Sequence, residues 1–231
     1  VMSLDDPRPT RRQRVEEKES AILTAARGIF EDKGYDGARV ADIAAAIGVA
    51  EGTIYTYFPT KDALIRAMLE RFWEGITAEA RTAVSGRAGT FARLEALAVS
   101  HLSLCLRNWS FLELTLRMVP GRSHDAQTRS LMRGYVAVFD EAFTAGQDRG
   151  DLRAEAELWI ARDQFYVALE YSGRTLMLRA NPDPAPVITA LTDNFRASYG
   201  AAPQTYPLEG RLARLEATSA IHIIKPGRRA Q

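Results

Sequence analysis

The segment from Val40 to Lys61, VADIAAAIGVAEGTIYTYFPTK, constrains the fold of this chain more than any other. Its first part has apolar residues at i, i+3, i+4 and i+7: Val40, Ile43, Ala44 and Ile47. This spacing predicts one buried face of a helix, which Gly48 then ends. A second short helix begins near Glu51 and stops before Pro59, because proline disfavours the helical conformation in the residue preceding it. Two short helices joined by a glycine turn are typical of a helix-turn-helix.

The outer face of the second helix consists of small and hydroxyl-bearing residues, which suit contact with phosphates and base edges. These residues are Gly52, Thr53, Tyr55, Thr56 and Tyr57. After Pro59, Thr60 is suited to cap a further helix, so that Lys61 lies where backbone N–H groups and a cation converge. This is a suitable place for a phosphate. The residues also leave open a packed helical corner that binds no ligand.

The block from Ala21 to Leu69 resembles the DNA-binding head of the TetR family of bacterial transcriptional regulators. Its most specific part is GVAEGTIYTYFPTKDAL, in which the glycines, the aromatic residues and the lysine follow the family's order. The rest of the chain is similar to the family only in size and helical pattern. The resemblance implies an all-α protein, with an N-terminal three-helix helix-turn-helix head followed by a helical regulatory and dimerisation body.

The resemblance also implies a set of DNA-binding residues. Gly52 would allow close approach to DNA, and the tyrosine hydroxyls and Lys61 would contact phosphates. Thr56 is the first candidate for a base contact and Glu51 the second, through cytosine N4. The whole set is Arg39, Glu51, Gly52, Thr53, Tyr55, Thr56, Tyr57 and Lys61.

Arg39 departs from the family's pattern, because it stands where a Ser or Thr commonly caps the first helix of the motif. Loss of this cap costs about 1 kcal/mol locally. Arg39 either adds a contact to DNA or is a solvated surface residue. The polar N-terminal residues, which include Arg8 and Arg11, are expected to form either a basic arm that reaches DNA or an ordinary solvated tail.

Composition is that of an ordinary globular protein of one or two domains, with 231 residues, 46% of them hydrophobic, and a net charge of +1. Any electrostatic attraction to DNA must therefore be local. The single cysteine, Cys105, excludes an internal disulfide framework and is compatible with a reducing cytosol. The longest mostly apolar stretch, Ala96 to Leu106, is too short to span a bilayer. We expect a cytoplasmic protein with no membrane partner.

Apolar periodicity predicts helices along almost the whole chain and divides it into four parts. We expect a flexible basic arm over 1–14, the DNA-binding domain over 15–60, a helical ligand-binding and dimerisation domain over 61–200, and a tail of unknown role over 201–231. Nine main helices are expected, at 15–33, 40–47, 51–58, 61–84, 90–107, 110–119, 123–148, 154–179 and 185–199.

The last two predicted helices, 154–179 and 185–199, have apolar or aromatic residues on more than one face. Their large aromatic residues cannot all point into one small core: Trp159, Phe165, Tyr166, Tyr171 and Phe195. The resemblance implies a homodimer through these helices, which would form a four-helix interface across a two-fold axis. The alternative is a thicker core within one subunit.

The resemblance implies a small-molecule effector in the body, where polar groups lie among apolar ones. The candidates are His101, Trp109, Glu113, Arg117, Tyr135, Phe139, Phe165 and Tyr166. Taken alone, each fits a core position better than a ligand contact or, for Glu113 and Arg117, an i,i+4 ion pair better than a ligand contact. Their aromatic character favours an apolar or amphipathic effector, such as an acyl chain, its thioester or a drug-like aromatic.

The resemblance thus implies a DNA-binding transcriptional regulator, a repressor that such an effector releases from a double-stranded DNA operator. The histidines show no catalytic or metal-ligand spacing, so we expect no enzyme, no cofactor and no metal. Two alternatives stay open: a helical adaptor that binds protein through the helix-turn-helix, and an all-helical enzyme that uses the same pocket.

Overall fold

The computed structural model describes residues 10–117 and 126–201, and all regular secondary structure in them is helical. The helices are α1 (Arg11–Gly37), α2 (Val40–Ala46), α3 (Glu51–Tyr57), α4 (Lys61–Val84), α5 (Thr90–Arg117), α6 (Ala126–Asp148), α7 (Leu158–Met177) and α8 (Ala185–Tyr199). The predicted all-α class is confirmed. None of the described helices is long and apolar enough to cross a membrane.

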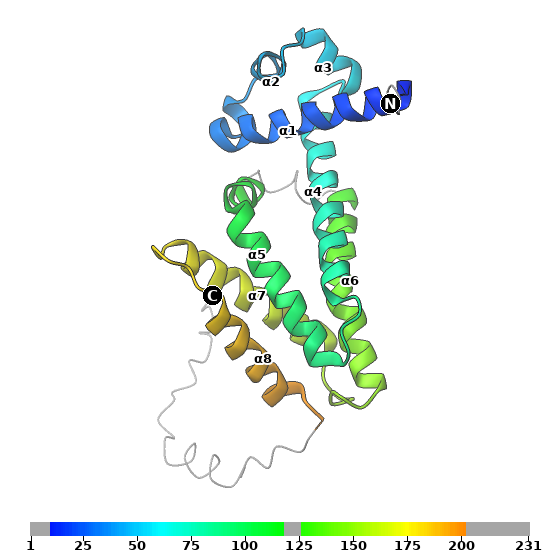
Figure 1. The fold of residues 1–231 in the computed structure, drawn as a ribbon, viewed down its shortest axis with the longest axis vertical. Helices are drawn as coiled ribbons and strands as arrows, with labels where there is room; N and C mark the ends of the chain where they lie inside the picture. The colour runs from blue at the N-terminus through cyan, green and yellow to red at the C-terminus, as the bar shows by residue number, and fades with distance from the viewer. Residues whose placement is uncertain (1–9, 118–125, 202–231) are drawn as a thin grey trace, which may run out of the picture.

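The molecule is elongated, with α1, α2 and α3 gathered into a head at one end (Figure 1). Helix α4 leaves the head and runs into the body, where it packs on α5 and α6. Helices α7 and α8 complete the body against α5. Helix α1 also packs directly on α5, so head and body meet through two routes, α4 and the α1–α5 contact.

The head is held together by apolar residues from each of its three helices. Ile22, Ala26 and Phe30 recur every fourth residue of α1 and are fully buried. They belong to one core with Ile43 of α2 and Ile54 of α3. This core fixes α2 and α3 from behind, so that their other faces are available to solvent.

Two glycines set the directions of the head helices. Gly48 has φ +66°, and the N–H groups of Gly48 and Val49 donate to the carbonyls of Ala45 and Ala44 in a Schellman-type end to α2. Gly34 has φ +68° and breaks α1 three residues before its assigned end. The predicted role of Gly48 as a helix break is confirmed, and the break at Gly34 directly follows the predicted end of the first helix at 33.

Helix α1 begins four residues earlier than the sequence predicted. The Thr10 side chain accepts from the N–H of Gln13, and the Gln13 side chain accepts in return from the N–H of Thr10. This capping box starts the helix at Arg11, so residues 11–14 of the predicted arm are helical. The T-x-x-Q signature was present in the sequence and was missed. Residues 1–9 of the arm and 202–231 of the tail lie outside the described residues.

The two helices predicted over 90–107 and 110–119 are one helix, α5, with a kink. Asn108 is the residue with non-helical dihedral angles, φ −123° and ψ 23°. Its Nδ2 donates to the carbonyl of Leu104 at 3.1 Å. No glycine or proline follows the kink before Arg117, so the helix resumes.

Helix α7 begins at Leu158, four residues after the predicted start at 154. The preceding residues are held by other partners: the Gln147 side chain donates to the carbonyls of Arg153, Ala154 and Ala156. An isolated bridge also joins Leu152 to Gly200 at the end of α8. The bridge joins residues far apart in sequence, and helical periodicity reveals neither it nor the contacts of Gln147. Helix α8 has the predicted bounds.

Candidate DNA-binding face and candidate effector site

Helix α3 lies at the outer end of the head, on the side away from the body (Figure 1). Ile54 and the C-cap residue Phe58 are buried, with 1% and 6% of their surfaces exposed. On the opposite side, Glu51, Gly52 and Thr56 are exposed, and Tyr55 is 43% exposed. The structure therefore presents the start and one side of α3 to solvent while its apolar side is held rigidly.

The remaining α3 candidates are less accessible. Thr53 and Tyr57 are half-buried, and Tyr57 packs against the head core. The hydroxyl of Thr56 donates to the carbonyl of Gly52 at 3.0 Å. Because that hydroxyl already donates its hydrogen within the helix, it can contact a base mainly as an acceptor.

Gly52 has no conformational reason to be a glycine. Its φ is not positive, and a Cβ at this position would meet no heavy atom within 4 Å. Glycine inside a helix destabilises by roughly 0.5–1 kcal/mol relative to alanine. Glycine at position 52 thus lowers the stability of the helix, and nothing in the fold requires a glycine there.

Lys61 has contacts within the head that the sequence did not predict, and its phosphate contact stays a prediction. Its Nζ donates to the backbone carbonyl of Tyr35 and lies 4.4 Å from the centroid of the Tyr35 ring. It also lies 5.8 Å from the centroid of the Phe30 ring, and it is half-buried. Lys61 therefore ties the end of α1 to the start of α4, where Thr60 accepts from the N–H of Ala63 as predicted. Sequence spacing gave no sign of this tie, because its partners are 26 residues apart.

Arg39 is exposed and is the N-cap residue of α2, with no side-chain hydrogen bond to the helix. The absence of a hydroxyl cap there is confirmed. Asp42 in the first turn of α2 pairs with Lys33 at 2.8 Å, which links α2 to α1. The role of Arg39 in DNA contact stays a prediction.

Five of the eight candidate effector residues come together in the body. His101 of α5, Tyr135 and Phe139 of α6, and Phe165 and Tyr166 of α7 are all buried. Their rings contact one another, with centroid distances of 5.2 Å for His101–Tyr166, 5.7 Å for Tyr135–Tyr166 and 4.9 Å for Phe139–Phe165. We call these five residues the aromatic cluster.

The polar groups of the aromatic cluster are neutral. Burial lowers the pKa of His101 to about 4, so its imidazole is uncharged near neutral pH. Burial also raises the pKa of Tyr135 and of Tyr166 well above the usual phenol range. Nδ1 of His101 lies 2.8 Å from Oη of Tyr135 and makes the one hydrogen bond between described side chains of the cluster.

The other three candidates belong to the part of α5 that follows the kink at Asn108. Trp109 and Glu113 are half-buried on the part of α5 beyond the kink, and Glu113 has a partner. The side chain of Arg117 lies outside the described residues, so the predicted Glu113–Arg117 pair is not tested.

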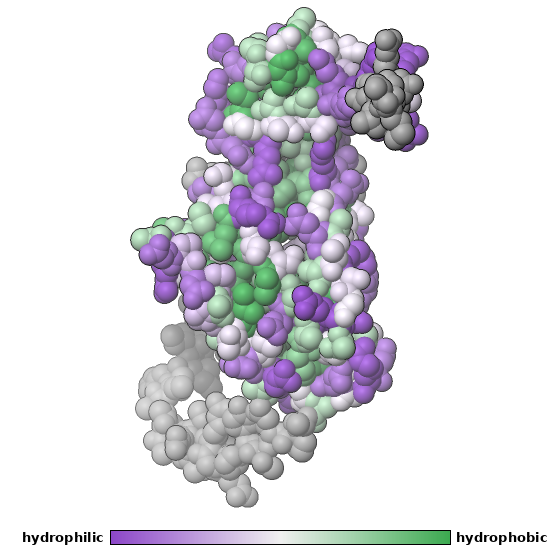
Figure 2. Space-filling model, viewed as in Figure 1, coloured by the Kyte–Doolittle hydropathy of each residue, from purple (hydrophilic) through white to green (hydrophobic). Residues whose placement is uncertain are grey.

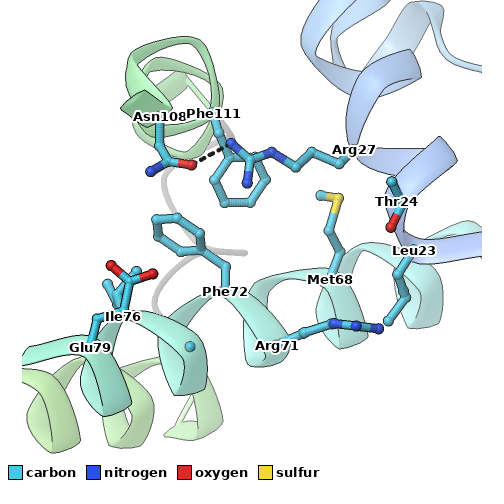
Figure 3. Close-up of a pocket in the computed structure, with 11 residues that line it drawn as sticks. Leu23, Thr24, Arg27, Met68, Arg71, Phe72, Ile76, Glu79, Asn108 and Phe111 are labelled. Atoms are coloured by element: carbon cyan, nitrogen blue, oxygen red, sulfur yellow. Dashed lines mark hydrogen bonds between the residues drawn. The ribbon is translucent and has the colours of Figure 1, made fainter. Parts of the chain in front are cut away.

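A cavity of about 330 Å³ lies between α1, α4 and α5, where the head meets the body (Figure 3). Nη2 of Arg27 donates to Oδ1 of Asn108 at 2.7 Å, and the Arg27 guanidinium lies 4.7 Å from the centroid of the Phe111 ring. Nε of Arg27 pairs with Glu31 at 2.7 Å. The sequence analysis missed Arg27, since its partner Asn108 is 81 residues away.

The outer face of α7, up to its C-cap, has several large exposed apolar side chains. Trp159, Val167, Tyr171 and Leu178 are 57%, 63%, 73% and 85% exposed. Figure 2 shows hydrophobic patches on the body in the region of α5 and α7, among largely hydrophilic flanks. Of the five aromatic residues predicted to exceed one core, the other three are buried: Phe165, Tyr166 and Phe195.

Comparison with known proteins supports the assignment of the head. The family model described as bacterial regulatory proteins, tetR family, matches residues 22–68. The HTH-type transcriptional regulator CymR of Pseudomonas putida is 39% identical over 74 residues, which are 32% of this chain and only 36% of that protein. The fatty acid metabolism regulator protein of Bacillus subtilis (strain 168) is 22% identical over 161 residues, which are 68% of this chain and 82% of that protein.

Two solved structures share the whole arrangement of head and body. The fatty acid degradation regulator FadR from Bacillus halodurans matches with a TM-score of 0.67 at 21% identity, over 76% of this chain and 93% of that one. The transcriptional regulator FadR from Bacillus subtilis, solved in complex with stearoyl-CoA, also has a TM-score of 0.67, at 19% identity over 75% of this chain and 95% of that one. At this identity the likeness concerns the fold.

Proposed function

The chain belongs to the TetR family of bacterial regulatory proteins, and from this premise we propose that it is a repressor that binds an operator in double-stranded DNA and is released by a small apolar or amphipathic effector. The observation that carries the proposal is α3, which is buried through Ile54 and exposed through Gly52 and Tyr55. The proposed activity is binding alone, in the cytoplasm where the operator lies.

The DNA contacts are proposed to centre on the exposed start of α3. Gly52 lets the backbone approach the major groove, while Tyr55 is positioned to contact phosphate. Thr56 and Glu51 are the candidates for reading bases. Arg39, Thr53, Tyr57 and Lys61 contribute at the edges, and Lys61 does so only where it exchanges the Tyr35 carbonyl for a phosphate.

A second copy of the chain is proposed to pair through α7 and α8. The exposed stripe on α7, with Val167 and Tyr171 at its centre, offers the apolar surface that such a pair would bury. A two-fold pair of heads would then reach half-sites about one helical turn, roughly 34–36 Å, or a small multiple apart.

The effector is proposed to bind at the aromatic cluster. Support comes from the convergence of five candidate residues there and from the fatty-acid regulators that share this fold, one of them solved with stearoyl-CoA. An effector that binds one arrangement of the heads better than the other shifts the dimer between DNA-competent and released states.

The shift is proposed to reach the head through the two routes that join it to the body. Helix α4 carries Phe72, whose ring lies 4.6 Å from that of Phe111 on α5, measured between centroids. Arg27 of α1 holds the kink of α5 through Asn108, as Figure 3 shows. A movement of α5 would therefore act on α1 and α4 together.

Binding to DNA from the region upstream of the chain's own gene tests the proposal. The dissociation constant should rise steeply with salt, by roughly 10³-fold or more between about 50 and 200 mM. Binding releases cations from the DNA, and a higher salt concentration opposes that release. Gly52→Ala should weaken binding by roughly tenfold, equivalent to about 1.4 kcal/mol, because a methyl group blocks close approach. The same variant should unfold at equal or slightly higher denaturant concentration, because alanine favours a helix.

Gly28→Ala is the matched control. Gly28 is also an exposed helical glycine at which a Cβ would meet no heavy atom within 4 Å, but it lies on α1. It should gain similar stability and keep full DNA affinity. Absence of binding at low salt to every upstream fragment would favour the adaptor or the enzyme, and equal affinity of the two variants would remove Gly52 from the interface.

A further inference from the structure

Two buried side-chain atoms in the described part of the chain have no hydrogen-bond partner: Nε2 of His101 and Oη of Tyr166. The two residues are only 6% and 8% exposed, and their rings meet edge to face in the aromatic cluster. An unsatisfied buried polar group costs about 1–3 kcal/mol, so native proteins keep few of them. That both lie in one cluster indicates that this position serves a polar ligand group and not only packing.

The hydrogen bond to Tyr135 decides which proton His101 carries. If Tyr135 donates to Nδ1, then Nε2 carries the hydrogen and is the only unsatisfied group of the pair. If Nδ1 donates instead, both the lone pair of Nε2 and the hydroxyl hydrogen of Tyr135 are left without a partner. The first arrangement leaves fewer unsatisfied groups, so His101 presents an N–H donor at Nε2. Tyr166 presents an O–H beside it.

The charges around the cluster disfavour an anion there. The carboxylates of Glu170 and Glu79 help to raise the pKa of Tyr135, and Asp140 helps to raise that of Tyr166. Arg162, whose positive charge acts to lower the pKa of Tyr166, is itself bonded to Asp140 at 3.0 Å. Arg107 is likewise paired, with Glu79 at 2.7 Å. An anion among these buried rings would lose its hydration while both of these cations already have carboxylate partners, and it would face two neutral hydrogen-bond donors. A group that suits both conditions is an uncharged acceptor.

We infer that the effector, on the proposed function above, carries a neutral carbonyl oxygen, as in an ester, a thioester or a ketone, and that this oxygen accepts hydrogen bonds from Nε2–H of His101 and from the hydroxyl of Tyr166. A carbonyl oxygen has two lone pairs and can satisfy both donors. The apolar remainder of the effector lies against the rings of Phe139 and Phe165. A free fatty acid is the wrong form of the ligand, and its ester or thioester is the right one.

Four probes with the same hydrocarbon chain test this inference in the full-length protein: methyl laurate, dodecane, laurate and dodecyltrimethylammonium. Tryptophan fluorescence can report binding, because the Trp73 ring lies 5.9 Å from that of Tyr135, between centroids. Methyl laurate should bind most tightly. Tyr166→Phe should reduce its affinity by roughly 2- to 12-fold, the factor for one net hydrogen bond, and should leave dodecane binding unchanged.

Tyr166→Phe is a safe variant, since the hydroxyl that it removes has no partner in the free protein and its loss should not lower stability. Tyr199→Phe is the matched control, because its hydroxyl bonds to Gln164 at 2.6 Å outside the cluster. This variant should keep the full preference for the ester over the alkane.

Several outcomes would overturn the inference. These are equal affinity for ester and alkane, tighter binding of laurate or of the ammonium probe, an unchanged ester affinity in Tyr166→Phe, or no binding of any probe. None of them affects the salt-dependent DNA binding of the ligand-free protein, so failure of the effector chemistry and failure of the regulator are read from separate experiments.

Discussion

Gly52 lies in the first turn of α3 and Lys61 is the first residue of α4, and both suit a phosphate contact by position. Of the two, Gly52 is the residue that the fold does not require, since a Cβ at this position would meet no heavy atom within 4 Å. Lys61 is engaged with the Tyr35 carbonyl and ring. Loss of function in a Lys61 variant would therefore mix damage to the head with loss of a DNA contact, whereas a Gly52 variant separates the two effects.

His101 should make stability depend on pH. Its pKa in the folded protein is about 4, below the ordinary value of 6.5, so the unfolded chain binds more protons between these values. Above pH 6.5, His101 should not lower the free energy of unfolding. As the pH falls from 6.5 to 4, the free energy of unfolding should decrease by at most about 3 kcal/mol. Denaturant unfolding at several pH values measures this slope.

His101→Gln should lose that part of the slope, because glutamine does not titrate there. Tyr166→Phe, at a neighbouring position of the cluster, should retain it. If His101→Gln and the unsubstituted protein show parallel pH dependence between 6.5 and 4, then the imidazole is not held neutral by burial.

At the scale of whole elements, the contact between α1 and the kink of α5 is the feature that periodicity does not reveal. At the kink, the Asn108 side chain donates to the carbonyl of Leu104 and accepts a hydrogen bond from Arg27. The guanidinium also lies over Phe111. A charged fork held against an aromatic ring is specific to arginine, so lysine cannot reproduce it.

Arg27→Lys should weaken the coupling between effector and DNA more than either binding event. With methyl laurate as the effector, the ratio of operator affinities without and with ligand should fall by roughly threefold or more, within the range of coupling energies of about 1–3 kcal/mol. Operator titrations with and without the ester measure this ratio.

Arg81→Lys is the control, because Arg81 also bridges two helices, through Glu141 at 2.9 Å, but lies in the body and is half exposed. It should leave the ratio unchanged. An unaltered ratio in Arg27→Lys would assign the transmission to α4 alone.

At the scale of the molecule, the exposed apolar stripe of α7 is the surface that one subunit leaves unexplained. Val167→Asp places a charge at the centre of this stripe and should convert the dimer into a monomer at micromolar concentration. Burying an unpaired charge in the interface would cost several kcal/mol. Light scattering after gel filtration measures the mass. Operator affinity should fall in parallel, since one head reaches only one half-site.

Val99→Asp controls for a charge at an exposed valine, because Val99 is 44% exposed on α5. This variant should remain a dimer. The reverse result, a dimer with Val167→Asp and a monomer with Val99→Asp, would move the interface from α7 to α5.

The sequence by itself determined the helical class and the helix-turn-helix of this protein, because their signals are local. The spacing of Val40, Ile43 and Ile47, the glycine at 48 and the proline at 59 were enough to predict the helix-turn-helix, and apolar periodicity was enough for the all-α class. The same local signals placed α8 correctly. The candidate effector residues were partly predictable, because aromatic residues on helices of one body converge when those helices pack.

Only the tertiary structure decided which partners those residues have. The Lys61–Tyr35 and Arg27–Asn108 contacts and the Leu152–Gly200 bridge depend on where separate elements meet. The unsatisfied atoms of His101 and Tyr166 are visible only once burial is known. Periodicity reports which face of a helix is apolar, but the energy of a polar side chain depends on what the fold brings within about 3 Å of it.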